Sequence, residues 1–139
     1  MKIVLQNGRR FMFRFDKGDE VFAGISKFME EQKITACAFN GIGSTSEVEL
    51  GYYNQHLKEY RKKPYLEELE VISLIGNGSM VEGKPAIHAH GMFGRNDFTT
   101  LGGHVFKLVT LVTCEIFLIK MDGNLERKNN PEWNLKLFD

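Results

Sequence analysis

The chain has 139 residues, 42% of them hydrophobic and 12% aromatic, which is enough apolar material for a single domain spanning residues 1–139. Lysine and arginine together number 18 and match the 18 aspartates and glutamates, so no overall basic field exists to hold a polyanion. No apolar segment approaches the roughly 20 residues that span a bilayer, and the apolar run at the N-terminus is too short for a signal sequence.

The first 33 residues predict a strand and then a helix. Residues 9–15 alternate phenylalanine with other side chains, which is typical of a strand with one buried face. Turn residues and an N-cap follow between residues 16 and 20. Apolar side chains then recur at i, i+4, i+7 and i+8, which predicts an amphipathic helix ending near Lys33. They are Val21, Ile25, Phe28 and Met29.

The middle of the chain predicts a second pair of strands. Residues 34–40 have strand character, and the Gly-Ile-Gly-Ser-Thr segment at 41–45 is predicted to form the next turn. Alternation resumes over residues 46–54, which predicts the partner strand. The polar segment 56–65 carries three successive basic residues, and we interpret it as a solvated loop.

The segments that follow predict further strands. Residues 66–75 form a long apolar strand candidate, and the Gly-Asn-Gly-Ser segment at 76–79 is predicted to close it as a hairpin turn. Residues 80–83 would pair back weakly. Residues 105–120 are rich in Val, Thr, Ile and Phe, which favours one long strand or two short ones. In the tail, four apolar residues are expected to dock on the body or on a neighbouring subunit: Trp133, Leu135, Leu137 and Phe138.

Together these elements amount to about seven short strands and one main helix. That combination predicts an α+β fold with a central, largely antiparallel β-sheet. Cys37 and Cys114 lie in apolar strand-like segments and do not resemble a disulfide framework. We therefore expect a reducing, cytoplasmic location and no membrane association.

Three of the four histidines lie between residues 86 and 105. His88 and His90 would point to the same side of a strand, about 7 Å apart at a rise of roughly 3.3 Å per residue. If the chain then doubles back, His104 reaches the same face, and Gly102-Gly103 carries no side chain that would obstruct it. Three convergent imidazoles match the ligand set of a zinc site with an open fourth position. The same spacing also fits three histidines that only pack, without a metal.

Glu115 interrupts an apolar run. A carboxylate that is buried without a partner is costly, so three interpretations stay open at this point. Glu115 is a member of a buried ion pair, a group that orients a ligand histidine, or a residue exposed on a sheet edge.

Six short motifs follow one another along nearly the whole chain. They are Gly41-Ile-Gly43-Ser44, Leu50-Gly51-Tyr52-Tyr53, Glu70 to Asn77, Gly83 to His90, Gly102-Gly103-His104 and Cys114-Glu115-Ile116. In this order they resemble the plants-and-prokaryotes-conserved domain, abbreviated PPC. The paired histidines followed by Gly-Gly-His are the most specific part of the resemblance.

The resemblance implies a compact subunit with a central antiparallel sheet that assembles as a homotrimer. It also implies a metal at the residues that match His88, His90 and His104. Plant members join this domain to AT-hook motifs, and the family is widely described as DNA-binding. This sequence contains no Arg-Gly-Arg-Pro segment of the kind that enters the minor groove. DNA is thus a partner implied by the family rather than one favoured by the charge of this chain.

Two hypotheses of function follow. The first is a trimeric, metal-binding PPC domain that acts as a regulatory or DNA-associated module. The second is a metal-dependent enzyme, a lyase or hydrolase, because an open fourth position on zinc can hold water or a substrate oxygen. The fold of the family is also remotely similar to that of acetolactate decarboxylase. In an enzyme, Glu115 and Glu49 are the first candidates for proton transfer.

Overall fold

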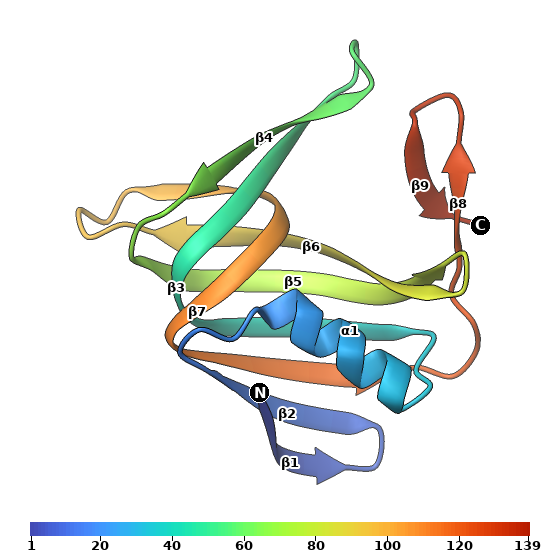
Figure 1. The fold of residues 1–139 in the computed structure, drawn as a ribbon, viewed down its shortest axis with the longest axis horizontal. Helices are drawn as coiled ribbons and strands as arrows, with labels where there is room; N and C mark the ends of the chain where they lie inside the picture. The colour runs from blue at the N-terminus through green and yellow to red at the C-terminus, as the bar shows by residue number, and fades with distance from the viewer.

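The computed structural model describes all 139 residues and consists of one helix and nine strands (Figure 1). In chain order the elements are β1 (Lys2–Asn7), β2 (Arg10–Asp16), α1 (Val21–Glu31), β3 (Cys37–Asn54), β4 (Glu59–Tyr65), β5 (Leu69–Val81), β6 (Lys84–Gly94), β7 (Thr100–Lys120), β8 (Arg127–Asn130) and β9 (Leu135–Phe138).

Seven of the strands form one sheet in the order β1-β2-β7-β6-β5-β3-β4, and every neighbouring pair is antiparallel. In addition β7 pairs with β3, so β7, β6, β5 and β3 close into a ring. Strands β8 and β9 form a separate two-stranded sheet, which we call the C-terminal hairpin (Figure 1). The predicted α+β fold with a largely antiparallel sheet of seven strands and one helix is confirmed.

Helix α1 lies across one face of the sheet (Figure 1). Phe11 and Phe13 of β2 are buried beneath it, with ring centroids 5.0 and 4.8 Å from that of Phe28 in edge-to-face geometry. The helix ends at Glu31, two residues before the predicted end. The chain has no helix with the length and apolar character required to cross a membrane. The helix buries the four apolar residues predicted for its inner face, together with Phe22: Val21, Phe22, Ile25, Phe28 and Met29.

The turn predicted at residues 41–45 is wrong, because β3 continues through this segment. The glycines there allow close contact between strands. A Cβ atom on Gly41 would lie 2.3 Å from Cδ1 of Ile116, and one on Gly43 would lie 2.3 Å from the carbonyl oxygen of Thr113. The pairing of β3 with β5 also shifts register here, which is typical of a bulge that bends a strand.

The hairpin turn predicted at residues 76–79 is also wrong, because β5 continues to Val81. The actual turn lies at Glu82 and Gly83, which have φ angles of 52° and 78°. Glycine at position 76 is again required by packing, since a Cβ atom there would lie 2.4 Å from the ring of Phe39.

Two strands lie where the sequence pattern did not indicate them. The polar segment 56–65, predicted to be a loop, contains β4, and β1 precedes the first predicted strand. Both are outermost in the strand order, and their side chains are mostly exposed. An edge strand without a buried face lacks the apolar alternation by which strands are recognised in sequence.

Candidate metal centre

The three histidines of the 86–105 segment converge on one site. His88 and His90 lie on β6 on either side of the buried Ala89, so they project from the same face of the strand. His104 on β7 is the register partner of His90. The ring centroids of the three residues are 5.0 to 5.3 Å apart, and one nitrogen from each lies within 4.8 Å of the others. The sequence prediction that these side chains meet is therefore correct in geometry.

Two consecutive glycines allow β7 to approach its neighbours at this point. A Cβ atom on Gly102 would lie 2.7 Å from the carbonyl oxygen of Gly91, and one on Gly103 would lie 2.9 Å from that of Gly51. Real Cβ atoms do not come that close to a backbone oxygen. The Gly-Gly pair before His104 thus has the role that the sequence indicates, which is to remove side chains at a close strand contact.

The surroundings keep the imidazoles of His88 and His104 neutral. Burial, and after it the positive charges of His88, His90, Lys62 and Arg127, together lower the pKa of His104 to about 4. Burial and then the charge of Arg127 also lower the pKa of His88. Neutral imidazole is the form that coordinates a metal, so both rings have the protonation state that coordination requires at neutral pH.

Protein groups also contact the Nδ1 atoms of two histidines. The hydroxyl oxygen of Tyr60, on β4, lies 3.4 Å from Nδ1 of His104. A guanidinium nitrogen of Arg127, on β8, lies 3.2 Å from Nδ1 of His88. The ring of Phe106 packs against His104 with a centroid distance of 4.3 Å. The site is thus a three-nitrogen cluster with an aromatic wall and a guanidinium in direct contact with one of its histidines.

A cavity of about 380 Å³ lies beside the cluster and is bounded by the C-terminal hairpin. His88 and His104 contribute to its wall, and so do Leu135 and Leu137 of β9. Of the four apolar residues predicted to dock, Leu135 is half-buried, whereas Trp133, Leu137 and Phe138 stay exposed, so docking of the tail stays a prediction. The Tyr53 hydroxyl also donates a hydrogen bond to the carbonyl oxygen of Trp133.

The two carboxylates considered for proton transfer lie elsewhere. Glu115 is exposed on β7, between β2 and β3, where Arg14 and Ile42 are its register partners. It is neither buried nor on an edge strand. Glu49 lies 3.5 Å from the ammonium group of Lys62, with which it forms an ion pair. Neither carboxylate belongs to the group of potential metal ligands.

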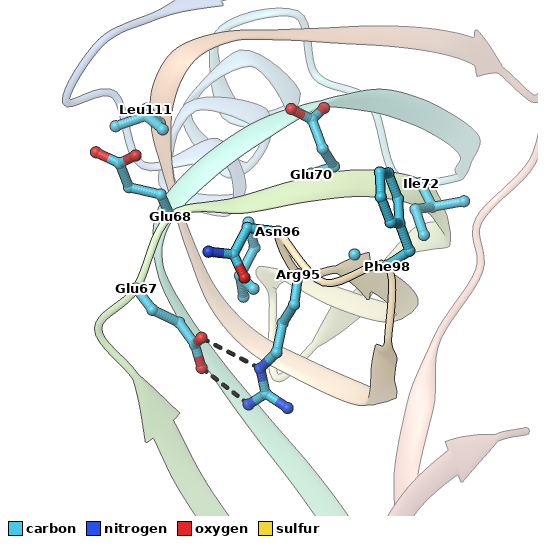
Figure 2. Close-up of a pocket in the computed structure, with 10 residues that line it drawn as sticks. Glu67, Glu68, Glu70, Ile72, Arg95, Asn96, Phe98 and Leu111 are labelled. Atoms are coloured by element: carbon cyan, nitrogen blue, oxygen red, sulfur yellow. Dashed lines mark hydrogen bonds and ion pairs between the residues drawn. The ribbon is translucent and has the colours of Figure 1, made fainter.

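A larger pocket, of about 600 Å³, contains none of the histidines (Figure 2). Glu67 and Arg95 form a two-pronged ion pair at its rim, with N–O distances of 2.9 and 3.2 Å (Figure 2). The nearby Phe98 is 93% exposed. This pocket offers carboxylates and an apolar surface but no cluster of metal-ligating nitrogens, so the histidine cluster is the stronger candidate site.

Sequence reasoning missed Tyr60 and Arg127 as parts of the site. Tyr60 lies in the segment that was interpreted as a loop, and Arg127 lies 39 residues beyond His88 in the polar tail. Neither residue belongs to a local spacing pattern with the histidines, so no sequence signal pointed to them.

Comparison with known proteins identifies the family. Residues 3–122 match the sequence profile of the Plants and Prokaryotes Conserved (PCC) domain. The chain belongs to this family, which is the one that the sequence motifs indicated as PPC. No curated protein sequence gives a significant match to the chain.

Solved structures of relatives share the fold over nearly the whole chain. A metal-containing protein from Archaeoglobus fulgidus is 36% identical, with a TM-score of 0.88 and coverage of 99% of both chains. A candidate DNA-binding protein from Bacteroides thetaiotaomicron is 26% identical, with a TM-score of 0.92 and coverage of 97% of this chain and 94% of that one.

The remote similarity to acetolactate decarboxylase is confirmed at the level of the fold. The enzyme from Bacillus subtilis superimposes with a TM-score of 0.58 at 16% identity, over 91% of this chain and 58% of the enzyme. At this identity the likeness concerns architecture alone.

Proposed function

We propose that this protein is a metal-binding PPC-domain protein that holds one divalent ion, zinc, through His88, His90 and His104. The observation that carries the proposal is the convergence of one nitrogen from each residue within 4.8 Å. The metal-containing relative from Archaeoglobus fulgidus supports it. Three imidazoles fit the donor preference of zinc and leave its fourth position free. Bound zinc would supply a Lewis acid at the edge of the cavity beside the C-terminal hairpin.

Replacing His90 by alanine tests the metal site. His90 is exposed, so its removal leaves no cavity in the core, while it deletes one of three ligands. We expect about one zinc ion per wild-type chain by elemental analysis after dialysis, and loss of the ion from H90A. The matched control is H56A, which removes the fourth histidine, an exposed residue on the β3–β4 turn. Full zinc retention by H90A would exclude this site.

The proposed assembly is a homotrimer, as the family resemblance implies. The support from this chain is an exposed apolar hollow on the sheet, formed in part by Ile42, Ile72 and Val112. These side chains are 58%, 48% and 68% exposed. Apolar side chains that gather on one surface mark a contact with another protein.

The proposed role of the assembly is that of a DNA-associated regulatory module in the cytoplasm. The description of the Bacteroides relative supports the DNA association, and the two free, buried cysteines suit a reducing compartment. Arg61, Lys62 and Lys63 are exposed on β4 and provide the local positive charge that the neutral chain otherwise lacks.

An electrophoretic mobility shift at graded salt tests the DNA association. We expect the wild type to retard duplex DNA at low ionic strength, and R61E to need about fivefold to tenfold more protein, because phosphate contacts dominate such binding. K2E makes the same charge change on β1, at the opposite end of the sheet, and should bind as the wild type does. Absence of any shift at the lowest salt would contradict the DNA role.

The second candidate function is a metal-dependent lyase or hydrolase. One observation favours it, which is the cavity of about 380 Å³ that opens beside His88 and His104. A crystal structure of the zinc-loaded protein separates the two functions. A carboxylate or thiolate in the fourth position favours a structural site, whereas water that faces the cavity favours catalysis.

A further inference from the structure

Arg127 fixes the start of the C-terminal hairpin to the body of the protein. Its Nε donates to the hydroxyl of Ser79 at 3.0 Å, and its Nη2 donates to the amide oxygen of Asn77 at 2.9 Å. Its Nη1 donates to the carbonyl oxygen of Lys136 at 3.1 Å, and the ring of Phe138 stacks 3.9 Å from the guanidinium. Because β5 and both strands of the hairpin take part, the guanidinium links the hairpin to the sheet.

The same guanidinium contacts the metal site. Its Nη2 lies 3.2 Å from Nδ1 of His88. Arginine carries five N–H donors and no acceptor, so the Nδ1 atom must be the acceptor in this hydrogen bond. A neutral imidazole has only one nitrogen with a free lone pair. In this arrangement the lone pair of His88 is on Nδ1 and is directed at Arg127.

Whichever ring nitrogen of His88 binds a metal, the hydrogen bond from Arg127 to His88 is lost. If the metal binds Nδ1, it takes the lone pair that accepts from Arg127. If it binds Nε2, the proton of the neutral ring is on Nδ1, and two N–H donors then face each other at 3.2 Å.

The contact at the neighbouring histidine is of a different kind. The Tyr60 hydroxyl, 3.4 Å from Nδ1 of His104, is able to accept as well as to donate. It therefore tolerates a metal on the other nitrogen of that ring, and Arg127 is the group that opposes loading of the site. The positive charge of the guanidinium acts in the same direction, because it repels a cation.

We propose that Arg127 and the metal compete for His88, so that loading of the site detaches Arg127 and releases the C-terminal hairpin. This inference rests on the proposed metal-binding function and adds a regulatory role for residues beyond the family match, which ends at residue 122. Release is feasible because the other polar links of the hairpin to the body are few and lie at the surface, where half-buried Tyr53 is the least exposed residue involved. They are Tyr53 with Trp133, Asn134 with Lys58, and Lys136 with Glu82.

Zinc affinity of an Arg127 variant tests the competition. R127M removes the donors and the charge and keeps an unbranched apolar stem. We expect it to bind zinc about tenfold to a hundredfold more tightly than the wild type, the range that corresponds to one hydrogen bond from a charged group. The measurement is competition with a chromophoric chelator at fixed pH. The control K128M removes the adjacent, exposed cation, which pairs with Asp139, and should stay within about twofold of the wild type.

Hydrogen exchange of the wild type tests the release without any substitution. We expect the backbone amides of residues 127–138 to exchange faster in the zinc-loaded protein than in the metal-free protein, while the core of β7 is unchanged. Unchanged or slower exchange of the hairpin on loading would overturn the proposal. So would equal zinc binding by R127M, which would mean that Arg127 has no effect on the site, or weaker binding, which would mean that Arg127 supports His88 as a ligand.

The outcomes separate this proposal from the metal site itself. If neither the wild type nor R127M binds zinc, the proposed function fails, and the competition fails with it. If the wild type binds zinc and R127M has the same affinity, the metal site stands and only the competition is excluded. Zinc binding by R127M alone would support the competition and show that Arg127 closes the wild-type site.

Discussion

At the scale of single residues, the two cysteines show how burial controls their chemistry. Both thiols are fully buried, and desolvation of the thiolate raises the pKa of Cys37 to about 11 and that of Cys114 to about 12, from an ordinary value of 9.0. They serve as small apolar side chains in the core, as the sequence indicated, and not as nucleophiles.

We expect neither cysteine to react with iodoacetamide in the native protein at pH 8, and both to react in urea. The thiols of the unfolded chain ionise near pH 9, and those of the folded protein ionise at higher pH. The contribution of the thiols to the free energy of unfolding is therefore fully present below about pH 9 and falls as the pH rises from there towards 11. Mass spectrometry after alkylation and thermal melting between pH 7 and 10.5 check both points. Rapid alkylation of the native protein would contradict the burial of these thiols.

Local spacing predicted the three histidines of the cluster, which come from one segment. It did not predict the neighbouring residues that come from other parts of the chain. His88, His90 and His104 belong to adjacent paired strands, so the period of a strand was sufficient to bring them together. Arg127 reaches the site through the placement of a separate hairpin, which no periodicity encodes. Glu115 was considered because it interrupts an apolar run, but its side chain faces solvent.

At the scale of elements, helix α1 depends on one carboxylate. The side chain of Glu20 accepts hydrogen bonds from the backbone N–H groups of Phe22 and Ala23 in the first turn, at 3.2 and 2.6 Å. It also accepts one from the N–H group of Leu108 on β7, at 3.1 Å. Glu20 thus caps the helix and joins its start to the sheet.

We expect E20A to lower the free energy of unfolding by about 2 kcal/mol, because three backbone donors lose their acceptor. Urea denaturation monitored by circular dichroism measures this loss. E20Q retains one acceptor oxygen and should lose about half as much. A loss below about 0.5 kcal/mol in E20A would show that water replaces the carboxylate.

The elements that were predicted wrongly share a physical cause. Glycine-rich segments at 41–45 and 76–79 suggested turns, because glycine tolerates positive φ. In the structure both segments lie within long strands, where glycine is needed because a neighbouring backbone or ring occupies the space of a side chain. A single sequence does not distinguish these two uses of glycine. The helix and β2 were predicted correctly because each has a periodic buried face.

At the scale of the whole molecule, the exposed apolar hollow of the sheet argues for self-association. We expect the wild type to sediment with three times the 15.9 kDa mass of the chain, and I42D to sediment as a monomer, because a charge in the centre of a buried interface is costly. L57D introduces the same charge at an exposed leucine on the β3–β4 turn and should remain trimeric. A monomeric wild type in analytical ultracentrifugation would contradict the proposed assembly.

The pairing of β7 with β2, β3 and β6 has a consequence for the order in which the protein is made and folded. Cys37 pairs with Lys120, so the ring closes only when the last strand of the sheet has been synthesised. A nascent chain that ends before Thr100 has β2 paired only with β1, and it lacks the third histidine. Contacts of such large sequence separation make folding slow. The core and the histidine cluster are therefore completed together, at a late stage of synthesis and folding.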